Sequence, residues 1–458
     1  MKYLFITKAI HLFLKIRFYF GVYFILIILI RGLEIDGKNI HKKRIAYSKS
    51  KCIKEWRNRS ILVFEKTGLL EDLTAVAQNY GRRFPTLILI PRFYVNILAE
   101  YFLPANQRND FLTRLEYDEK AHDRYKSLCN YIFPRLAKKF DAKILISANY
   151  TYGNERDIHE VAVANFLKVV ILYKECLMSN ADSENLVELL ANSRPFVGSK
   201  ILVYNRVEEE RQLKSLAVKK VQIHTTGSPR FDRLIAKAES KVHVRDARIV
   251  FFVHDYIPEG DIWYVGGVRN AFREYSNQEI VKGLLIFLES ARKFPQIHFT
   301  IKTKVTLSTI QYVGNFLASH KLPENIQVIF GNGLAETALS NCVGALGFNT
   351  TALIDSVASG AQIATLSTST TNIESSAQFR EAIRDYLIDY EELATEITGS
   401  YSLELWINDI LSKKDLDGFL KKELTAKGRK LLETTVGNPD GNSSSHVLRE
   451  LFIVDQNN

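Results

Sequence analysis

Short runs of consecutive apolar residues alternate with longer stretches of helical periodicity along most of the chain. In the first half, we expect strands at residues 61–64, 86–90, 143–147, 168–172, 200–204 and 221–224, and helices at 69–79, 118–140 and 157–166. Strands that are apolar at consecutive positions are typical of sheets covered on both faces. The alternation therefore predicts a parallel α/β sheet with helices on both sides.

The same alternation begins again after a charged stretch at residues 237–246. Strands are expected at 248–253, 297–302, 326–330, 343–346 and 362–366, helices at 278–293, 334–339 and 350–359, and a helical tail at 386–399, 403–411 and 415–433. The pattern predicts two Rossmann-like, doubly wound α/β domains that face each other across a cleft. We expect a leader at 1–59, an N-terminal domain at 60–240 and a C-terminal domain at 241–458, which includes the closing helices.

The leader combines an uncharged apolar run with a basic segment. Residues 18–30 carry no charge, but these 13 residues fall short of the roughly 20 that a helix needs to span a bilayer. Cations flank the run on both sides, and no small-residue cleavage site follows it. We expect a shallow or in-plane membrane helix and a polybasic linker on anionic lipid, with the body on the cytoplasmic face. The alternative is a buried N-terminal helix followed by a solvated basic linker.

Charge and cysteine spacing narrow the classes of partner. The net charge of +10 lies in the leader, where 14 lysines and arginines in residues 1–60 oppose three acids, so the rest of the chain is close to neutral. A nearly neutral body disfavours a nucleic-acid partner. Cys52, Cys129, Cys176 and Cys342 lie far apart, without a CxxC pair, which argues against a structural zinc site or a disulfide framework.

The segment GFNTTALIDSVASGAQIATLS, residues 347–367, carries the strongest candidate chemistry. It predicts a strand, a tight glycine exit, a helix, a glycine cap at Gly360 and a further strand. Thr350 and Thr351 fall where a helix start leaves backbone N–H groups free for phosphate, and Asp355 lies one turn later, within reach of a ribose hydroxyl. The pattern equally fits a βαβ unit that serves only the core.

Other polar residues follow expected strands, at the edge where ligands bind in such sheets. Glu65 follows the first strand, Glu175 the fourth, and His254 the first strand of the second domain. Lys302 and Lys304 end the strand after that.

Two motifs together resemble a known family. The segment TGSPRFD in mid-chain and GFNTTALIDSVASG near the end resemble bacterial surface-carbohydrate glycosyltransferases of the two-Rossmann GT-B fold, and also the capsule-polysaccharide and CDP-glycerol glycerophosphotransferase group. ISANYTYGNERD, ILYKE and the late GNSSSHVLRELF fit the same resemblance, which spans roughly residues 60–450.

The resemblance implies a donor site in the second domain and an acceptor site in the first. Asn349, Thr350 and Thr351 would hold the donor phosphates, and Asp355 would replace the usual ribose-binding Glu with a side chain one methylene shorter. Lys302 and Lys304 would neutralise the pyrophosphate, unless they are merely solvated. No DxD-like metal motif occurs in a suitable place, so we expect no metal and no cofactor beyond the nucleotide-sugar substrate.

The mid-chain motif and the catalytic base each leave alternatives open. Gly227, Ser228, Arg230 and Asp232 would line the hinge and cleft; Arg230 and Asp232 would either pair with each other or contact substrate. Glu65, Glu175 or His254 would accept the proton of the acceptor hydroxyl in an inverting transfer.

The sequence thus predicts a membrane-associated glycosyltransferase on the cytoplasmic face of the plasma membrane. It would transfer a sugar from a nucleotide-sugar donor to a surface polysaccharide acceptor, and the leader favours an acceptor that is linked to lipid. A polyol-phosphate transferase, a nucleotide-sugar 2-epimerase and a non-catalytic scaffold of a polysaccharide assembly complex remain as alternatives.

Overall fold

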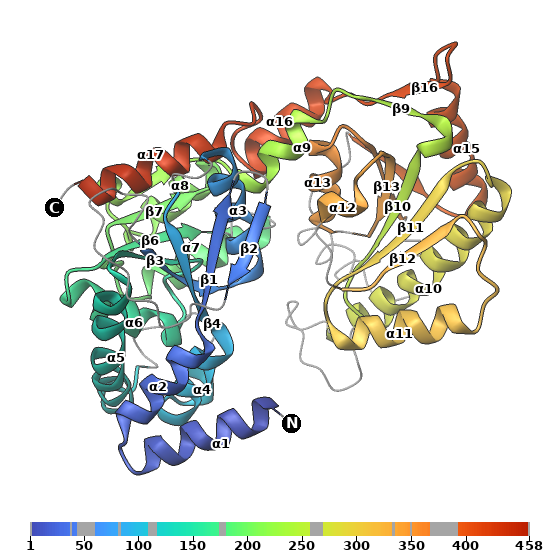
Figure 1. Cartoon of the computed structure of the whole chain (residues 1–458). Helices are drawn as coiled ribbons and strands as arrows, with labels where there is room; N and C mark the ends of the chain where they lie inside the picture. Colours follow the sequence, from blue (N-terminus) through green and yellow to red (C-terminus); the bar gives the residue numbers. More distant parts are fainter. Residues whose placement is uncertain are drawn as a thin grey trace. The chain divides into compact units, whose positions relative to one another are not determined.

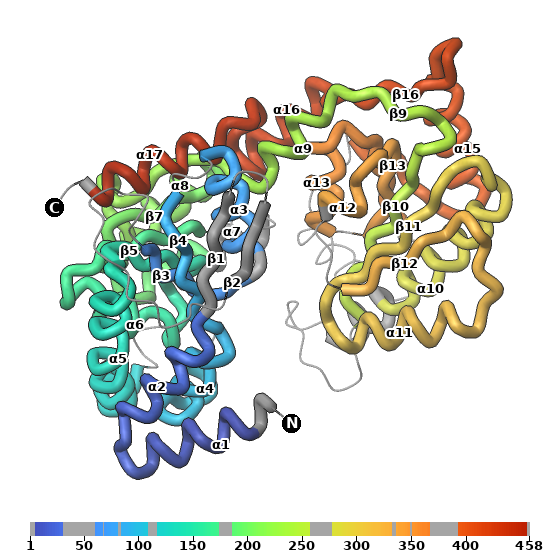
Figure 2. Tube along the Cα trace, in the orientation of Figure 1, coloured from blue at the N-terminus to red at the C-terminus, as the bar shows by residue number. Residues whose placement is uncertain are grey.

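The chain forms two compact units in the computed structural model (Figure 1). The structure describes residues 2–36, 39–43, 60–80, 84–108, 117–173, 180–256, 269–331, 335–348, 350–366 and 393–456. Unit 1 comprises Met1–Leu177, Ser183–Asp232 and Thr434–Asn458, and unit 2 comprises Arg233–Glu433 with Met178–Asp182. The chain passes into unit 2 just after Asp232, near the expected boundary at residue 240, and returns within α16 (Ala426–Thr435) (Figure 2).

Unit 1 is built on an eight-stranded sheet in the order β2-β1-β4-β3-β5-β6-β7-β8. Its six parallel strands are β3 (Ser60–Glu65), β4 (Thr86–Pro91), β5 (Ala142–Ser147), β6 (Lys168–Tyr173), β7 (Lys200–Val203) and β8 (Ile223–Thr225). All six were expected from their apolar runs, and the parallel α/β class is confirmed for this unit.

Helices bury both faces of this sheet. Ile61 and Val63 of β3 belong to the same buried cluster as side chains of α3 (Thr67–Tyr80) and of the last helix, α17 (Ser443–Gln456). Phe64, which alternates with them, contacts Phe133 of α5 (Glu119–Phe140) on the other face. The expected closing helix therefore forms, but it completes unit 1 rather than the second domain. Other helices of unit 1 are α4 (Arg92–Phe102), α6 (Gly153–Ala164), α8 (Arg206–Lys214) and most of α7 (Asn180–Ala191).

The basic linker expected within residues 31–59 is wrong in its first part, which forms a β-hairpin. β1 (Arg31–Asp36) and β2 (Asn39–Lys43) pair antiparallel, and β1 also pairs antiparallel with β4. The sequence signal is Gly-Lys at positions 37–38 between two short alternating runs, because glycine at the first loop position is typical of a two-residue hairpin turn. The other cations of this linker, from Arg44 to Arg59, lie outside the described residues.

The apolar leader forms two helices instead of one. α1 (Lys2–Lys15) and α2 (Tyr19–Leu29) are separated by Arg17, whose φ is +54°. Val22 and Leu26 are fully buried, and the Tyr94 hydroxyl of α4 donates a 2.8 Å hydrogen bond to the Val22 carbonyl oxygen. One face of the pair thus packs on α4 and α5 of unit 1, as in the buried-helix alternative. Among the described residues, no helix is both long and apolar enough to cross a membrane.

Unit 2 is built on a six-stranded, fully parallel sheet in the order β12-β11-β10-β13-β14-β15. The strands are β10 (Arg248–Val253), β11 (His298–Thr303), β12 (Ile326–Ile329), β13 (Cys342–Gly347), β14 (Gln362–Leu366) and β15 (Ala394–Ile397). The helices include α10 (Arg269–Lys293), α11 (Leu307–Ala318), α12 (Ala335–Ala338), α13 (Ala352–Ala358) and α15 (Ser400–Ser412). A second Rossmann-like sheet is therefore confirmed.

The expected helical tail is partly wrong. Residues 394–397 form the edge strand β15, and residues 419–421 form β16 (Phe419–Lys421), which pairs antiparallel with β9 (Lys241–His243). Both strands are three or four residues long and largely exposed, so they lack the apolar run that identified the central strands. Residues 386–392 lie outside the described residues.

Candidate functional site

The carboxyl edge of the unit 2 sheet brings most of the expected donor-site residues together. β10 lies between β11 and β13, and in this parallel register Val253 is opposite Thr303, while Phe252 is opposite Gly347. The segments that follow these three strands therefore begin side by side. His254 is 8% exposed and its ring lies 5.1 Å from the ring of Phe348, centroid to centroid.

A charged pair lies at the centre of this edge. The Lys304 Nζ donates to Asp255 Oδ2 at 2.8 Å, and the Thr306 hydroxyl donates to Asp255 Oδ1 at 2.8 Å. The Lys304 side chain is about half exposed (49%), so its ammonium is both oriented and accessible to solvent. Asp255 follows His254 after the expected strand, but the sequence assigned no role to Asp255 or to Thr306.

Lys302 has a different environment. It is 8% exposed, and its Nζ donates to the carbonyl oxygens of Thr303 (2.8 Å) and Gly331 (2.7 Å). The alternative that Lys302 is merely solvated is therefore wrong, and its expected contact with phosphate stays a prediction. Its ammonium joins the turn after β11 to the turn after β12, so it stabilises this edge of the sheet.

The turn between β13 and α13 has the expected strand–glycine–helix–glycine form. Gly347 must be small, because a Cβ there would lie 2.7 Å from Thr350 Cγ2. Gly360 has φ +75°, which confirms the glycine cap. The helix is shorter than expected, because the Thr350 hydroxyl accepts a hydrogen bond from the Ala352 amide (3.3 Å) and α13 begins only there.

The candidate side chains of this turn differ in exposure. Thr350 is buried, Thr351 is exposed, and Asp355 is half-buried on α13. Thr351 and Lys304 are therefore the described donor-site candidates that solvent reaches most readily. Asn349 lies outside the described residues.

The mid-chain motif TGSPRFD holds unit 1 together. The buried carboxylate of Asp72 on α3 accepts hydrogen bonds from the Tyr204 hydroxyl (2.6 Å), the Ser228 hydroxyl (3.2 Å) and the Arg230 amide (3.0 Å). Burial raises the pKa of Asp72, while Arg230 opposes that rise. The Arg230 guanidinium lies 3.5 Å from the carboxylate of Glu71. The expected Arg230–Asp232 ion pair is therefore wrong, because each residue has another partner.

Asp232 caps the last helix. Its Oδ1 accepts from the Ser443 amide at 3.0 Å, and its Oδ2 accepts from the Ser444 amide at 2.7 Å, at the start of α17. The carboxylate thus satisfies two backbone donors that a helix start leaves unpaired.

Two glycines allow close contact between the backbone of the TGSPRFD motif and the segment that leads into α17. Gly227 (φ +78°) and Gly437 (φ +93°) both have left-handed conformations. A Cβ on Gly227 would overlap Ser443, and one on Gly437 would overlap the Tyr204 carbonyl oxygen. The TGSPRFD motif and the GNSSSHVLRELF segment therefore lie together because they form one structural junction.

The carboxyl edge of the unit 1 sheet carries Glu65, which is half-buried at the end of β3. The next residue, Lys66, places its Nζ 5.0 Å from the centre of the Tyr152 ring. Glu175, the other carboxylate considered as a base, lies outside the described residues.

The turn that follows β5 in the ISANYTYGNERD segment lies at the same edge and is held by hydrogen bonds among its own residues. The Ser147 hydroxyl donates to Glu155 Oε2 (2.5 Å), and Asn149 Oδ1 accepts from both the amide and the hydroxyl of Thr151 (2.7 Å each). All four of these residues are at most 2% exposed. They fix the turn between β5 and α6.

Two buried histidines of unit 1 were missed at the sequence level. His122 Nδ1 lies 2.6 Å from Asp157 Oδ2, and its Nε2 lies 3.1 Å from Gln107 Oε1. His159 stacks on Phe64, and burial lowers its pKa to about 3. Neither histidine follows a strand, so the strand-end rule could not find them.

Within the described ranges, no three His, Cys, Asp or Glu side chains form a group that could hold a metal ion.

No protein-family model matches the chain, and no curated protein matches it. Solved structures that resemble it include the UDP-GlcNAc 2-epimerase from Neisseria meningitidis bound to UDP-GlcNAc, with 11% identity over 86% of this chain and 100% of that chain and a TM-score of 0.43. The UDP-GlcNAc 2-epimerase from Methanocaldococcus jannaschii has 12% identity over 86% of this chain and 99% of that chain, with a TM-score of 0.44. A glycosyltransferase from Rickettsia africae has 12% identity over 88% of this chain and 100% of that chain, with a TM-score of 0.42. These similarities are distant, so the function of this chain has to be argued from its own residues.

Proposed function

We propose that the chain is a glycosyltransferase of GT-B type that uses a nucleotide-sugar donor and a surface-glycan acceptor. Unit 2 binds the donor, and unit 1 binds the acceptor. The observation that carries the proposal is the carboxyl edge of the unit 2 sheet, where β10, β11 and β13 end side by side with His254, Lys304 and the 350–351 turn. Ligands of parallel α/β sheets bind at this edge.

In this proposal, Lys304 and the exposed hydroxyl of Thr351 contact the donor phosphates. Asp255 holds the ammonium of Lys304 in position at 2.8 Å until the phosphate arrives. An ammonium and hydroxyl donors stabilise the negative charge that develops on the nucleotide leaving group. Asp355 contacts the ribose.

Isothermal titration against UDP-, CMP- and GDP-linked sugars tests the donor site. Lys304→Ala should weaken binding of the preferred donor about tenfold, because a charged hydrogen bond contributes roughly 1.5–3 kcal/mol. Lys321→Ala is the matched control, since this exposed lysine follows α11 and lies away from the carboxyl edge. Failure of every donor to bind would refute the proposal.

We propose Glu65 as the base that accepts the proton of the acceptor hydroxyl. Glu65→Gln keeps the shape and removes the basic oxygen, so transfer should fall by about 10²-fold or more while donor binding persists. Unchanged transfer would move this role to Glu175 or His254.

The N-terminal helices support the proposal of a lipid-linked acceptor met at a membrane. Large apolar side chains of α1, α2 and the link between them remain exposed by 45–75%: Phe5, Leu12, Ile16, Phe18, Phe20, Phe24 and Ile28. Phe20, Phe24 and Ile28 recur every four residues along one face of α2, and cations lie nearby at Lys8, Lys15 and Arg17. Such a face lies in the interface of anionic membranes. The expected location is the cytoplasmic face of the plasma membrane.

A nucleotide-sugar 2-epimerase is the second candidate. It would use the same edge of unit 2 but needs no acceptor, which agrees with the closed polar turn after β5 in unit 1. Incubation of the donor alone in heavy water separates the candidates. Deuterium incorporation into the sugar without acceptor would favour the epimerase, and acceptor-dependent release of nucleotide would favour the transferase.

A further inference from the structure

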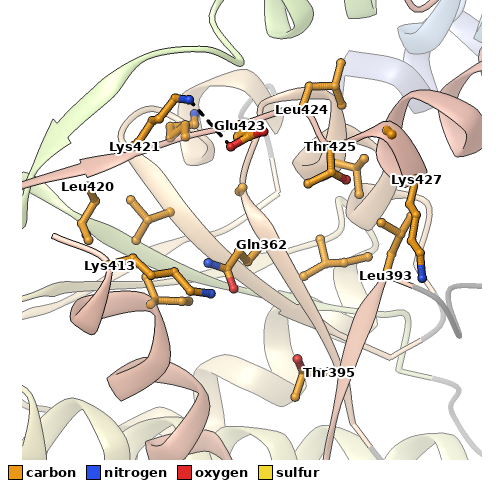
Figure 3. A pocket seen from close by; sticks show the side chains of 18 residues that line it. Gln362, Leu393, Thr395, Lys413, Leu420, Lys421, Glu423, Leu424, Thr425 and Lys427 are labelled. Carbon is orange, nitrogen blue, oxygen red and sulfur yellow. Dashed lines mark ion pairs between the residues drawn. The ribbon is translucent and has the colours of Figure 1, made fainter. Parts of the chain in front are cut away.

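Unit 2 contains a concave site at the edge of its sheet opposite to the donor-site candidates. A pocket of about 590 Å³ is lined by Gln362 and Ile363 at the start of β14, by Thr395 at the start of β15 and by residues 420–427 (Figure 3). The pocket therefore lies at the amino ends of the parallel strands. The donor-site residues lie at the carboxyl ends, so the two sites are separate.

Lysines and apolar side chains line this pocket. Its walls include Val343, Ile363, Ile410, Leu420 and Leu424, and its cations are Lys413, Lys421, Lys422 and Lys427. The single acid in the lining, Glu423, lies 3.8 Å from Lys421, as the dashed line in Figure 3 shows. The lining is thus apolar with an excess of positive charge.

Lys422 is the unusual member of this group. It is 5% exposed, and it alternates with the buried Leu420 and Leu424, so its side chain lies on the inward face of this segment. In the part of the chain that the structure describes, its Nζ has no carboxylate or carbonyl partner. Burial lowers the pKa of Lys422, and the neighbouring Lys237 lowers it further.

Burial of the Lys422 side chain removes part of the hydration of its ammonium, which is costly where no carboxylate pairs with it. An anion in the pocket would supply the missing partner. The charge of Lys413 is balanced by Asp409 at 2.6 Å, but the four lysines of the lining still outnumber Glu423 and Asp409, which favours a dianion over a monoanion. The apolar walls would contact the rest of the ligand, and the volume falls within the range of small-molecule sites.

We propose that this pocket binds a phosphate monoester that carries an apolar group, with Lys422 as the central phosphate ligand. The proposal is independent of the function assigned to the carboxyl edge. It assigns a second ligand site to unit 2, on a part of the sheet that the donor does not use.

Titration calorimetry of the full chain with octyl phosphate tests this proposal. Octyl phosphate should bind saturably at one site, octanoate and inorganic phosphate about tenfold more weakly, and neutral octyl glucoside not at all. Comparable binding of octyl glucoside would show that the site selects only for the alkyl group, and comparable binding of octanoate would show that it does not select a phosphate; either result would overturn the proposal.

Substitutions locate the site. Lys422→Met should weaken octyl phosphate binding by about tenfold or more, as expected for loss of a charged hydrogen bond. Lys422→Arg should stay within about threefold of the wild type, because it keeps the charge. The control Lys414→Met removes an exposed lysine outside the pocket and should leave binding unchanged.

The circular dichroism of each variant shows whether it folds. If Lys422→Met fails to fold, the comparison of Lys422→Arg with the wild type and the ligand series on the wild type still decide the question. Absence of octyl phosphate binding to the wild type, or full binding to a folded Lys422→Met, would overturn the proposal.

Discussion

Replacement of Asp232 by Ala should loosen the start of α17 without unfolding unit 1. The Asp232 carboxylate is 4% exposed and accepts two amide hydrogen bonds, at 3.0 Å from Ser443 and 2.7 Å from Ser444. Alanine leaves both donors without this partner at a site that water reaches poorly. Each charged hydrogen bond is worth roughly 1.5–3 kcal/mol, and the favourable interaction of the carboxylate with the helix start is lost as well. We therefore expect a local loss of about 3 kcal/mol.

Hydrogen exchange of the full chain is the suitable assay, because it reports on each segment separately in a protein with two units. Protection of the first turn of α17 should fall by about 10²-fold in Asp232→Ala. In Asp232→Asn, which keeps one acceptor oxygen, protection should fall by about tenfold, which corresponds to half the free energy. The end of α17 should remain protected, since Leu451 and Val454 are buried against α3. The control Asp440→Ala removes an exposed acid just before the helix and should change nothing. Unchanged protection in Asp232→Ala would refute the structural role of TGSPRFD.

Three further predictions concern stability. His159 is neutral when buried and its pKa of about 3 lies below the ordinary 6.5, so unfolding takes up a proton and stability falls with decreasing pH below 6.5. Between pH 6.5 and 4.5 this amounts to about 2 kcal/mol, which a His159→Phe variant should lack in urea unfolding. An identical pH dependence in the variant would contradict this prediction. Gly437→Ala should destabilise unit 1 by several kcal/mol, because its Cβ would overlap the Tyr204 carbonyl oxygen. The control Gly399→Ala has open space around it and should not destabilise the protein. Similar melting temperatures of the two variants would contradict the close approach of Gly437 to Tyr204. Lys302→Met should destabilise the protein without ligand by about 2–4 kcal/mol and lower its melting temperature, because it leaves buried carbonyl oxygens without their donor. Loss of nucleotide-sugar binding at full stability would instead support the expected phosphate role of Lys302.

The central strands could be predicted from the sequence because they are apolar at consecutive positions. β4, for example, is buried at its last five residues, and its expected range differs from the observed one by a single residue. Edge strands such as β15 and β16 could not be predicted in this way, since half or more of their residues face solvent. Their formation depends on a neighbouring strand that local sequence does not reveal.

The candidate site shows the same limit. The rule that ligands bind beyond the carboxyl ends of parallel strands selected His254, Lys304 and Thr351 as candidates, and the strand order places the three strands before them side by side. It could not identify the partner of each side chain. Lys302 bonds to a carbonyl 29 residues away, and Asp232 bonds to amides 211 and 212 residues away, so both roles follow from tertiary packing alone.

The central claim is that a nucleotide-sugar binds at the carboxyl edge of the unit 2 sheet. Hydrogen exchange of the full chain, with and without a saturating UDP-, CMP- or GDP-linked sugar, tests it most directly. For the donor that binds, the account predicts increased protection at residues 254–256, 303–306 and 350–353, and none in the lysine-lined pocket at 420–427. Saturable donor binding that leaves these three segments unchanged, or no binding of any donor, would contradict the account.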